Sequence, residues 1–483
     1  ALGQLVTIAL AHSLEVQAGE LAPLRQQALQ DEQRALFYPT LVGAASRQVD
    51  KDLFTLFALT QTAATTQYEV GVRELLPDNT RVSVTAASSR SRVTYLDNPG
   101  NTWPLFDPLR RSTLTVAVAK PLLRGAWREN ACGQLDLAHI SEQAAVARLQ
   151  RLRGEVIAGI EKQYWLLARL EIEEDLCRRS LARARLILDE RRGAAARGQA
   201  PEVDVLAAAE NIAARRADLL RLVRLRRDAA DALALLVYGE LTPRQLRSGE
   251  LVLQTAGLAV TVPGLPADSI AVRRALAVRD DVVEAQHNYA QAQLAAKLAG
   301  NATLPQLDVF GDYAVGRYTQ DGGLSYNATT SAITMRGSNP STMQENPWSV
   351  GVQLSIPIGA SPDDARAQLA RLALAEQRLG LAALEGRIYR EVRQALRACA
   401  GDREQVALRE QALTAAAAQL RAAWGAYRLG KLSTFQFLQY SAHFDEQYAA
   451  ALAAQYDLAC AVTDYYQASG LLLNLYLDPA AAR

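Results

Sequence analysis

The chain is dominated by two very long helical patterns at corresponding places in an internal duplication. One pattern runs from about residue 123 to 192 and the other from about 362 to 429, and neither contains an interior proline, the residue that breaks helices. At about 1.5 Å per residue each helix would be about 100 Å long, far longer than the helices of ordinary globular domains. The sequence therefore predicts an elongated fold in which helices pack lengthwise.

Similar segments flank both long patterns. Residues 8–40 and 274–306 are both helical patterns, and a proline marks the end of each, just before a strand-like run. Each long pattern ends at a short turn, with Gly198 in the first and Gly430 in the second, and a returning helical pattern follows. The arms between the last strand proline and these glycines are 77 and 73 residues long, so they match to about one helical turn. Two similar helical hairpins are predicted.

The duplication divides the chain into a first repeat (1–238), a proline- and glycine-rich connector expected at an equatorial position (239–272) and a second repeat (273–483). The first repeat is predicted to contain strands at about 79–90 and 112–121, a long helix at about 123–192 and a return helix at about 201–237. The second is predicted to contain strands at about 304–318 and 347–358, a long helix at about 362–429 and a return helix at about 433–475. Residues in this last helix follow alternating three- and four-residue steps, as in a coiled-coil seam: Phe437, Ser441, Phe444, Tyr448, Ala451, Gln455, Leu458, Val462 and Tyr465.

The strand-like runs have one apolar and one polar face. Apolar residues alternate with polar or small ones between Trp348 and Ile356, and again between Leu114 and Val118. Such a hairpin often forms the half-buried sheet of a soluble domain, but no other segment here offers a layer to cover it. The strands are about ten residues long, enough to cross a bilayer when tilted. Four strands cannot enclose an open lumen, whereas three chains would supply twelve, which suggests a trimer.

Composition narrows the classes of function. The chain is 49% hydrophobic and only 6% aromatic, a mixture that favours helices. A formal net charge of +1 gives no field that would attract nucleic acid. The sequence contains no run of eighteen apolar residues, so it predicts no transmembrane helix. The first residues show no secretory signal, so we expect a signal to be absent or already removed, and the lack of a cysteine at position 1 gives no support for a lipid anchor.

Three short motifs carry a family resemblance over nearly the whole chain. They are the two turn tracts at residues 197–206 and 427–435 and the strand-to-helix passage Lys120-Pro121-Leu122-Leu123-Arg124-Gly125. Together with the duplicated order of elements they resemble the TolC family of outer-membrane efflux proteins. The resemblance implies a mainly α fold with a membrane β-barrel: a homotrimer with a twelve-stranded barrel in outer-membrane lipid and a long α-helical barrel across the periplasm.

The resemblance also implies a function without enzymatic activity, cofactor, metal or nucleic acid. The chain would be the outer-membrane exit duct of a tripartite efflux or type I secretion system, working with a periplasmic adaptor (membrane fusion protein) and an inner-membrane transporter. The two turns would contact the adaptor through Gly198, Gln199, Gly430, Leu432 and Ser433.

The resemblance places a periplasmic gate at these turns. Asp204 and Tyr427 occupy positions at which family members hold the mouth closed. An arginine that some members carry is Leu432 here, and two aspartates are replaced by Gln436 and Gln439, so the usual acidic ring is missing. Our hypothesis is that Arg428 and Lys431 pair with Asp204 or Glu202. The alternative is that Asp204 only stabilises the first turn of its helix through the helix dipole.

Other signals point to chemistry only weakly. Residues 425–431 spell GxxxxGK, but they follow a helical pattern and lack the Ser or Thr that a phosphate-binding loop needs next. The four histidines have no metal-ligand spacing. Cys399 and Cys460 lie 31 residues before and 30 after Gly430, so they should be level in the hairpin, either as a disulfide or as two buried thiols. Two further interpretations remain: a non-conducting coiled-coil scaffold that bridges envelope layers, and a soluble helical enzyme.

Overall fold

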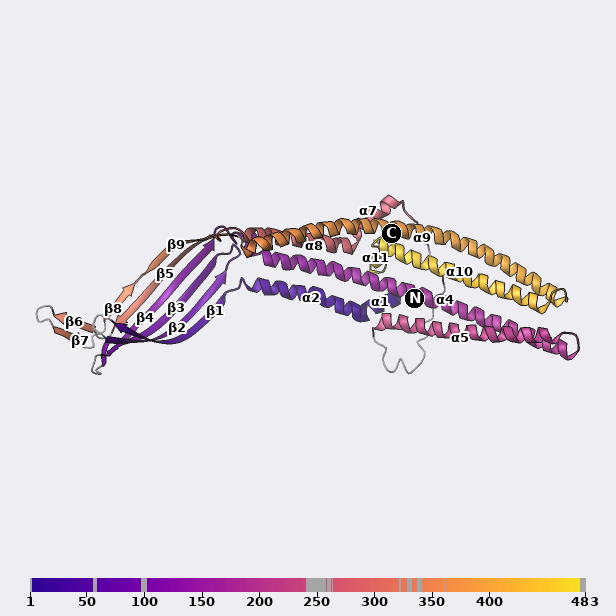
Figure 1. Cartoon of the computed structure of the whole chain (residues 1–483), viewed down its shortest axis with the longest axis horizontal. Coiled ribbons are helices and arrows are strands. Elements are labelled where there is room, and N and C mark those ends of the chain that lie inside the picture. Colours follow the sequence, from indigo (N-terminus) through magenta and orange to yellow (C-terminus); the bar gives the residue numbers. More distant parts are fainter. Residues whose placement is uncertain are drawn as a thin grey trace. The chain divides into compact units, whose positions relative to one another are not determined.

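The computed structural model describes residues 2–54, 59–96, 102–239, 258, 262, 264–320, 323–327, 332–336, 341–359 and 361–477. Its helices are α1 (Leu2–His12), α2 (Leu14–Ala35), α3 (Arg128–Ala131), α4 (Gly133–Ala196), α5 (Glu202–Tyr238), α7 (Asp268–Val278), α8 (Asp280–Ala302), α9 (Pro362–Arg428), α10 (Thr434–Ala468) and α11 (Leu472–Leu477). Its strands are β1 (Thr40–Phe54), β2 (Leu59–Leu75), β3 (Arg81–Leu96), β4 (Thr102–Pro121), β5 (Gln306–Gln320), β6 (Gly323–Asn327), β7 (Ala332–Arg336), β8 (Ser341–Glu345) and β9 (Trp348–Ser355) (Figure 1). The chain divides into a helical unit (1–25, 142–288 and 377–483) and a sheet unit (26–141 and 289–376).

The sheet unit is built on one antiparallel sheet. Its strands follow the order β1-β2-β3-β4-β5, and both β8 and β9 pair with β5 at the far edge (Figure 1). Strand β9 pairs with the first half of β5 and β8 with its second half. These two short strands therefore occupy one strand position, and the sheet has six positions. A separate two-stranded sheet joins β6 and β7.

The sheet has more strands than the sequence predicted. The four predicted strands correspond to β3, β4, β5 and β9, but the hairpin β1–β2, with 15 and 17 residues, was missed. Alternate positions of β1 on one face of the sheet are Leu41, Gly43, Ala45 and Arg47. Because only the first of them is a large apolar residue, β1 lacks the alternation of apolar and polar residues that predicts a strand. The predicted count of four strands per chain is therefore too low, because the described sheet has six strand positions.

One face of the sheet, called the apolar face here, carries exposed large hydrophobic side chains. They are between 41% and 75% exposed and share one face by register: Leu41, Tyr68, Val70, Val72, Val84, Leu114, Val116, Val118, Tyr313, Val315, Trp348, Val350, Val352 and Leu354. The opposite polar face carries Gln67, Glu69, Arg73, Ser83, Thr85, Thr113, Thr115, Asp312, Ser349 and Gln353. An apolar surface this continuous indicates an interaction with lipid or another protein.

The helical unit contains two helical hairpins, α4–α5 and α9–α10, with α1, α7, α8 and α11 beside them. Ile157 in α4 and Leu233 in α5 are fully buried in a cluster that includes Val6 of α1. Ile388 in α9 packs in a second cluster with Leu458 of α10. The seam predicted in the last helix is buried at Phe437, Ser441, Ala451, Leu458, Val462 and Tyr465. Burial of this stripe fixes the lengthwise packing of the helices.

The helix boundaries differ from the predicted ones in two places. The first long helix begins at Gly133 rather than near residue 123, after the short helix α3. The last return helix ends at Ala468 and is followed by Gly470 with a φ of 73°, a backbone conformation that stops a helix. Most of the predicted connector lies outside the described residues. None of the described helices carries a stretch apolar enough to cross a membrane.

The four cysteines are free thiols. Cys399 and Cys460 lie level in the α9–α10 hairpin, as predicted, but Sγ of Cys399 donates to the carbonyl oxygen of Ala461 at 3.1 Å. Burial raises the pKa of Cys399 to about 11, which keeps this thiol protonated and unreactive. We expect four titratable thiols per unfolded chain, in equal number with and without prior reduction. A gain of two thiols on reduction would show a Cys399–Cys460 disulfide.

Candidate functional site

Two turns close the helical hairpins, and local sequence explains both. Helix α4 ends at Ala196, and Gly198 adopts a φ of 73° before Pro201 precedes α5. Helix α9 ends at Arg428, and Gly430 adopts a φ of 71°. Only glycine adopts this left-handed conformation without strain. Residues 425–431 thus form a helix end and a turn, so the strand that a phosphate-binding loop requires is not there.

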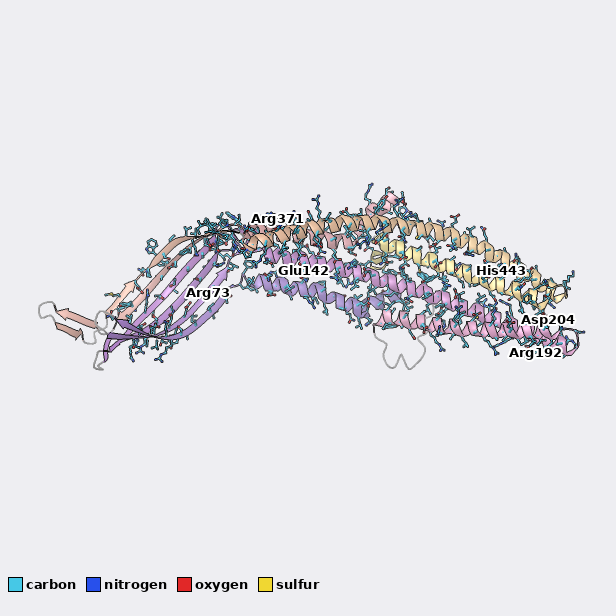
Figure 2. The ribbon with its side chains drawn as sticks, in the orientation of Figure 1. Arg73, Glu142, Arg192, Asp204, Arg371 and His443 are labelled. Atoms are coloured by element: carbon cyan, nitrogen blue, oxygen red, sulfur yellow. The ribbon has the colours of Figure 1, made fainter. Side chains whose placement is uncertain are left out.

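Asp204 connects the tips of the two hairpins. It lies in the first turn of α5, and its carboxylate accepts a hydrogen bond of 2.9 Å from Oγ1 of Thr434, the first residue of α10 (Figure 2 shows its place). The carboxylate also lies 4.0 Å from the guanidinium of Arg191 in α4. Thr434 is fully buried and the Asp204 side chain is 24% exposed. This aspartate therefore does more than cap its own helix.

An aromatic cluster lies beside this contact. The ring of Tyr427 stacks on Phe437 with a centroid distance of 5.0 Å and on Trp424 with 5.9 Å. The Arg191 guanidinium lies 4.6 Å from the Tyr427 ring centroid, a cation–π geometry. Burial raises the pKa of the Tyr427 hydroxyl. Helices α4, α9 and α10 are thus held together at the tips by one arginine and three rings.

The remaining predicted tip residues have other places. Among the described residues of the single chain no ion pair joins Asp204 or Glu202 to Arg428 or Lys431, so these pairs stay a prediction, and the cation near Asp204 is Arg191. Gln436 forms a capping box with Ser433 at the start of α10. The predicted turn residues Gly198, Gln199, Gly430 and Ser433 are exposed, as are Glu202, Arg428, Lys431 and Gln439, whereas Leu432 packs against the buried tip cluster. The role of Arg191 could not be predicted from the sequence, because an arginine seven residues before a turn glycine has no distinguishing local pattern.

A second polar contact joins the hairpins further from the tips. The carboxylate of Asp445 in α10, 8% exposed, accepts hydrogen bonds from Ser180 at 2.6 Å and Arg183 at 2.7 Å, both in α4. Arg215 of α5 lies 3.3 Å from it. A buried carboxylate needs such partners because water no longer stabilises its charge. The network fixes the register of α10 against the α4–α5 hairpin.

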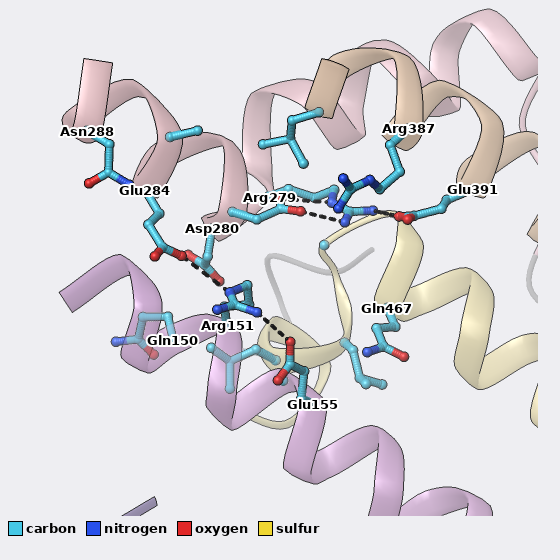
Figure 3. A pocket seen from close by; sticks show the side chains of 17 residues that line it. Gln150, Arg151, Glu155, Arg279, Asp280, Glu284, Asn288, Arg387, Glu391 and Gln467 are labelled. Carbon is cyan, nitrogen blue, oxygen red and sulfur yellow. Dashed lines mark hydrogen bonds and ion pairs between the residues drawn. The ribbon is translucent and has the colours of Figure 1, made fainter. Parts of the chain in front are cut away.

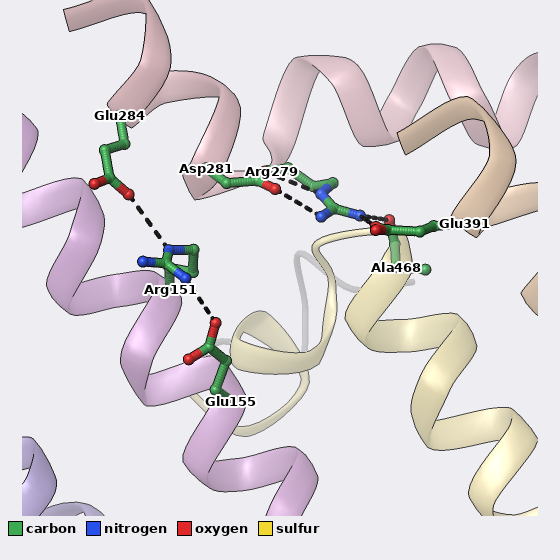
Figure 4. A network of polar contacts seen from close by, with 7 residues as sticks. All are labelled: Arg151, Glu155, Arg279, Asp281, Glu284, Glu391 and Ala468. Atoms are coloured by element: carbon green, nitrogen blue, oxygen red, sulfur yellow. Dashed lines mark hydrogen bonds and ion pairs between the residues drawn. The ribbon is translucent and has the colours of Figure 1, made fainter. Parts of the chain in front are cut away.

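A pocket of about 430 Å³ lies between α4, α8, α9 and the end of α10 (Figure 3). Arg279, at the junction of α7 and α8, bonds Asp281 at 2.6 Å, Glu391 of α9 at 3.0 Å and the carbonyl oxygen of Ala468 at 3.1 Å (Figure 4). Burial alone would lower the pKa of Arg279, but the ion pairs outweigh burial and raise it.

On the α4 side of the same pocket, Arg151 contacts Glu155 at 2.8 Å and Glu284 at 3.3 Å (Figure 4). These charged groups already satisfy one another across three helices. These two networks brace the helices around the pocket.

Comparison with known proteins gives a family match for part of the chain and similar solved structures for nearly all of it. Residues 271–471 match the family described as outer membrane efflux protein. The match covers less than half of the chain and lies almost entirely within the second repeat. Over this segment the chain therefore matches a family of outer-membrane efflux proteins, the class of protein that its motifs resemble. A comparison of the sequence with curated proteins gives no significant match.

Solved structures of outer-membrane channels share the fold of the whole chain. The channel CmeC of Campylobacter jejuni is 16% identical with a TM-score of 0.68, and the alignment covers 97% of this chain and 85% of that one. VceC of Vibrio cholerae is 15% identical with a TM-score of 0.68, covering 97% and 96%. The open state of MtrE of Neisseria gonorrhoeae is 19% identical with a TM-score of 0.68, covering 97% and 89%. The predicted fold of long helices with an antiparallel sheet is confirmed.

Proposed function

We propose that this outer membrane efflux protein works as a homotrimer that conducts substrates passively from the periplasm to the exterior. The observation that carries the proposal is the two-faced sheet. Its apolar face fits hydrocarbon and its polar face fits a water-filled lumen. In hydrocarbon every backbone polar group must be paired, so an open sheet with two free edges is stable there only if it closes on further copies.

The free edges of the sheet are complementary in direction. Strand β1 and the β8/β9 position are the two edges, and because six strands alternate in direction, β1 of one copy meets β9 of the next in antiparallel orientation. Three copies then supply eighteen strands instead of the twelve expected from the family resemblance. Barrels of 16–18 strands enclose an aqueous channel, so the additional hairpin β1–β2 gives this duct a wider outer pore.

The tip contacts support a gate. We infer that the Asp204–Thr434 hydrogen bond and the stacking of Arg191 on Tyr427 hold the α9–α10 tip against the α4–α5 tip in the closed state. The exposed turn residues around Gly198 and Gly430 are then free to contact a periplasmic adaptor, which links the duct to an inner-membrane transporter. In this scheme the partners supply the energy and choose the substrate, while the duct supplies the path.

Planar-bilayer recording tests the proposed function. The purified protein is expected to run as a trimer in detergent and to produce discrete single-channel currents after it inserts from one side. Protein denatured before addition is the control, because it lacks the folded sheet. A trimer that inserts but conducts nothing would favour the scaffold interpretation, and a monomer that stays in solution without detergent would contradict both.

A further inference from the structure

A row of arginines crosses the apolar face of the sheet. Strand pairing places Arg47 of β1 opposite Thr66, Thr66 opposite Arg90 of β3, and Arg90 opposite Arg110 of β4. The row ends at Thr319 of β5, which is opposite Arg110. Five neighbouring strands thus contribute three arginines and two threonines at one level. We call Arg47, Arg90 and Arg110 the arginine row.

A neighbouring level extends the positive charge. Arg317 of β5 stands one step before the row on the same face, opposite Ser112. No carboxylate stands at these paired positions. The arginines at these positions therefore have no carboxylate directly opposite them on a neighbouring strand.

The arginine row lies at the edge of the apolar surface. Between the row and the start of β3 the apolar face carries Val82, Val84 and Ala86. Arg90 comes nine residues after Arg81, the first residue of β3. At about 3.4 Å per residue this is about 30 Å along the strand, and a tilt of about 40° leaves about 23 Å of height. Outer-membrane barrels have an apolar band about 25 Å tall, so the row is level with the headgroups of the outer leaflet.

The three guanidinium groups face outward without a partner of opposite charge. Arg47, Arg90 and Arg110 are exposed, and within the described part of the chain none of them makes an ion pair or a side-chain hydrogen bond. By contrast, Arg111 on the polar face, next to Arg110, pairs with Glu345 at 2.5 Å. Like charges directly opposite on adjacent strands are destabilising. The Arg90 and Arg110 guanidinium groups therefore repel each other unless an anion lies between them.

We propose that the arginine row is a binding site for the phosphate groups of a phosphorylated glycolipid in the outer leaflet of the outer membrane. The inference rests on the proposed function, because that function directs the apolar face toward lipid and the end of the sheet beyond the row toward the exterior. Guanidinium groups bind phosphate oxygens through paired hydrogen bonds. A lipid phosphate bound here would neutralise the repulsion between Arg90 and Arg110 and so stabilise the sheet.

Native mass spectrometry of the detergent-solubilised trimer tests this site, with lipid A, a bisphosphorylated glycolipid, as the probe. The variant Arg90→Gln/Arg110→Gln is expected to bind lipid A at least fivefold more weakly than the unmodified trimer. The matched control, Arg73→Gln/Arg111→Gln, removes the same charge from strands of the same sheet but from its polar face, and it should bind as the unmodified trimer does. The variant Arg90→Lys/Arg110→Lys keeps the charge and should bind between the two.

Equal loss of lipid A in the control and the test variant would overturn the inference, as would unchanged binding in the test variant. Inorganic phosphate at the same concentration should not compete, since lipid A also contacts the apolar face through its acyl chains, and effective competition would indicate an ordinary anion site instead. Phosphatidylcholine, which has no net charge, should bind both variants equally. Bilayer recordings of the same variants separate the two proposals: conducting trimers with unaltered lipid A binding contradict only the lipid site, whereas a preparation that forms no trimer contradicts the proposed function.

Discussion

Deletion of residues 40–75 is expected to leave a trimeric channel whose membrane barrel is about one third narrower. The segment is the hairpin β1–β2, and the cut joins Pro39, just after α2, to Leu76, which begins the turn that leads into β3. Both ends lie on the same side of the sheet, so β3 replaces β1 as the edge and keeps its direction. Three copies would then supply twelve strands, and barrel diameter grows roughly linearly with strand number.

Pore size is the measurement for this deletion. Polyethylene glycols added from the outer side should be excluded at a smaller size, and the lumen cross-section should fall roughly twofold, since it scales as the square of the diameter. Averaged images of the unmodified trimer give a second measurement that does not depend on how well the variant folds, because they should show eighteen strands. Twelve strands in the unmodified trimer, or an unchanged exclusion limit in a trimeric variant, would contradict the assignment of β1–β2 to the barrel wall.

Replacement of Asp204 by alanine is expected to raise the open probability of the channel roughly 5- to 30-fold. The change removes the hydrogen bond to Thr434 and the 4.0 Å contact with Arg191. A hydrogen bond to a charged group contributes about 1.5–3 kcal/mol, and the partial exposure of these side chains reduces this to about 1–2 kcal/mol. Such a change in the free energy difference between the closed and open states corresponds to a roughly 5- to 30-fold change in the ratio of open to closed channels. Single-channel recording at low voltage measures it.

Matched variants separate the tip contact from simple helix capping. Glu202→Ala removes a carboxylate from the same first turn of α5 but breaks no contact between hairpins among the described residues, so it should leave gating unchanged. Thr434→Val removes the other half of the hydrogen bond and should reproduce the effect of Asp204→Ala. In the double variant the two effects should not add, because they act on one bond. Equal opening by Glu202→Ala would assign Asp204 to the helix dipole alone.

The sequence by itself determined the helical hairpins and the family resemblance. Two proline-free patterns of nearly equal length, each closed by a glycine with positive φ, leave no alternative to long paired helices. The turn tracts around Asp204 and Tyr427 then identified the tips. These features are local, so a linear reading of the residues reveals them.

Only the tertiary structure decided the features that depend on pairing between distant segments. The hairpin β1–β2 could not be recognised from the sequence of β1, since Arg47 interrupts its apolar face. Only strand pairing shows that Arg47 lies at the same level of the sheet as Arg90 and Arg110. In the same way, Thr434 is the partner of Asp204 although the two are 230 residues apart. Periodicity records which face of an element is apolar, but register and side-chain partners are set by packing across the sheet and between helices.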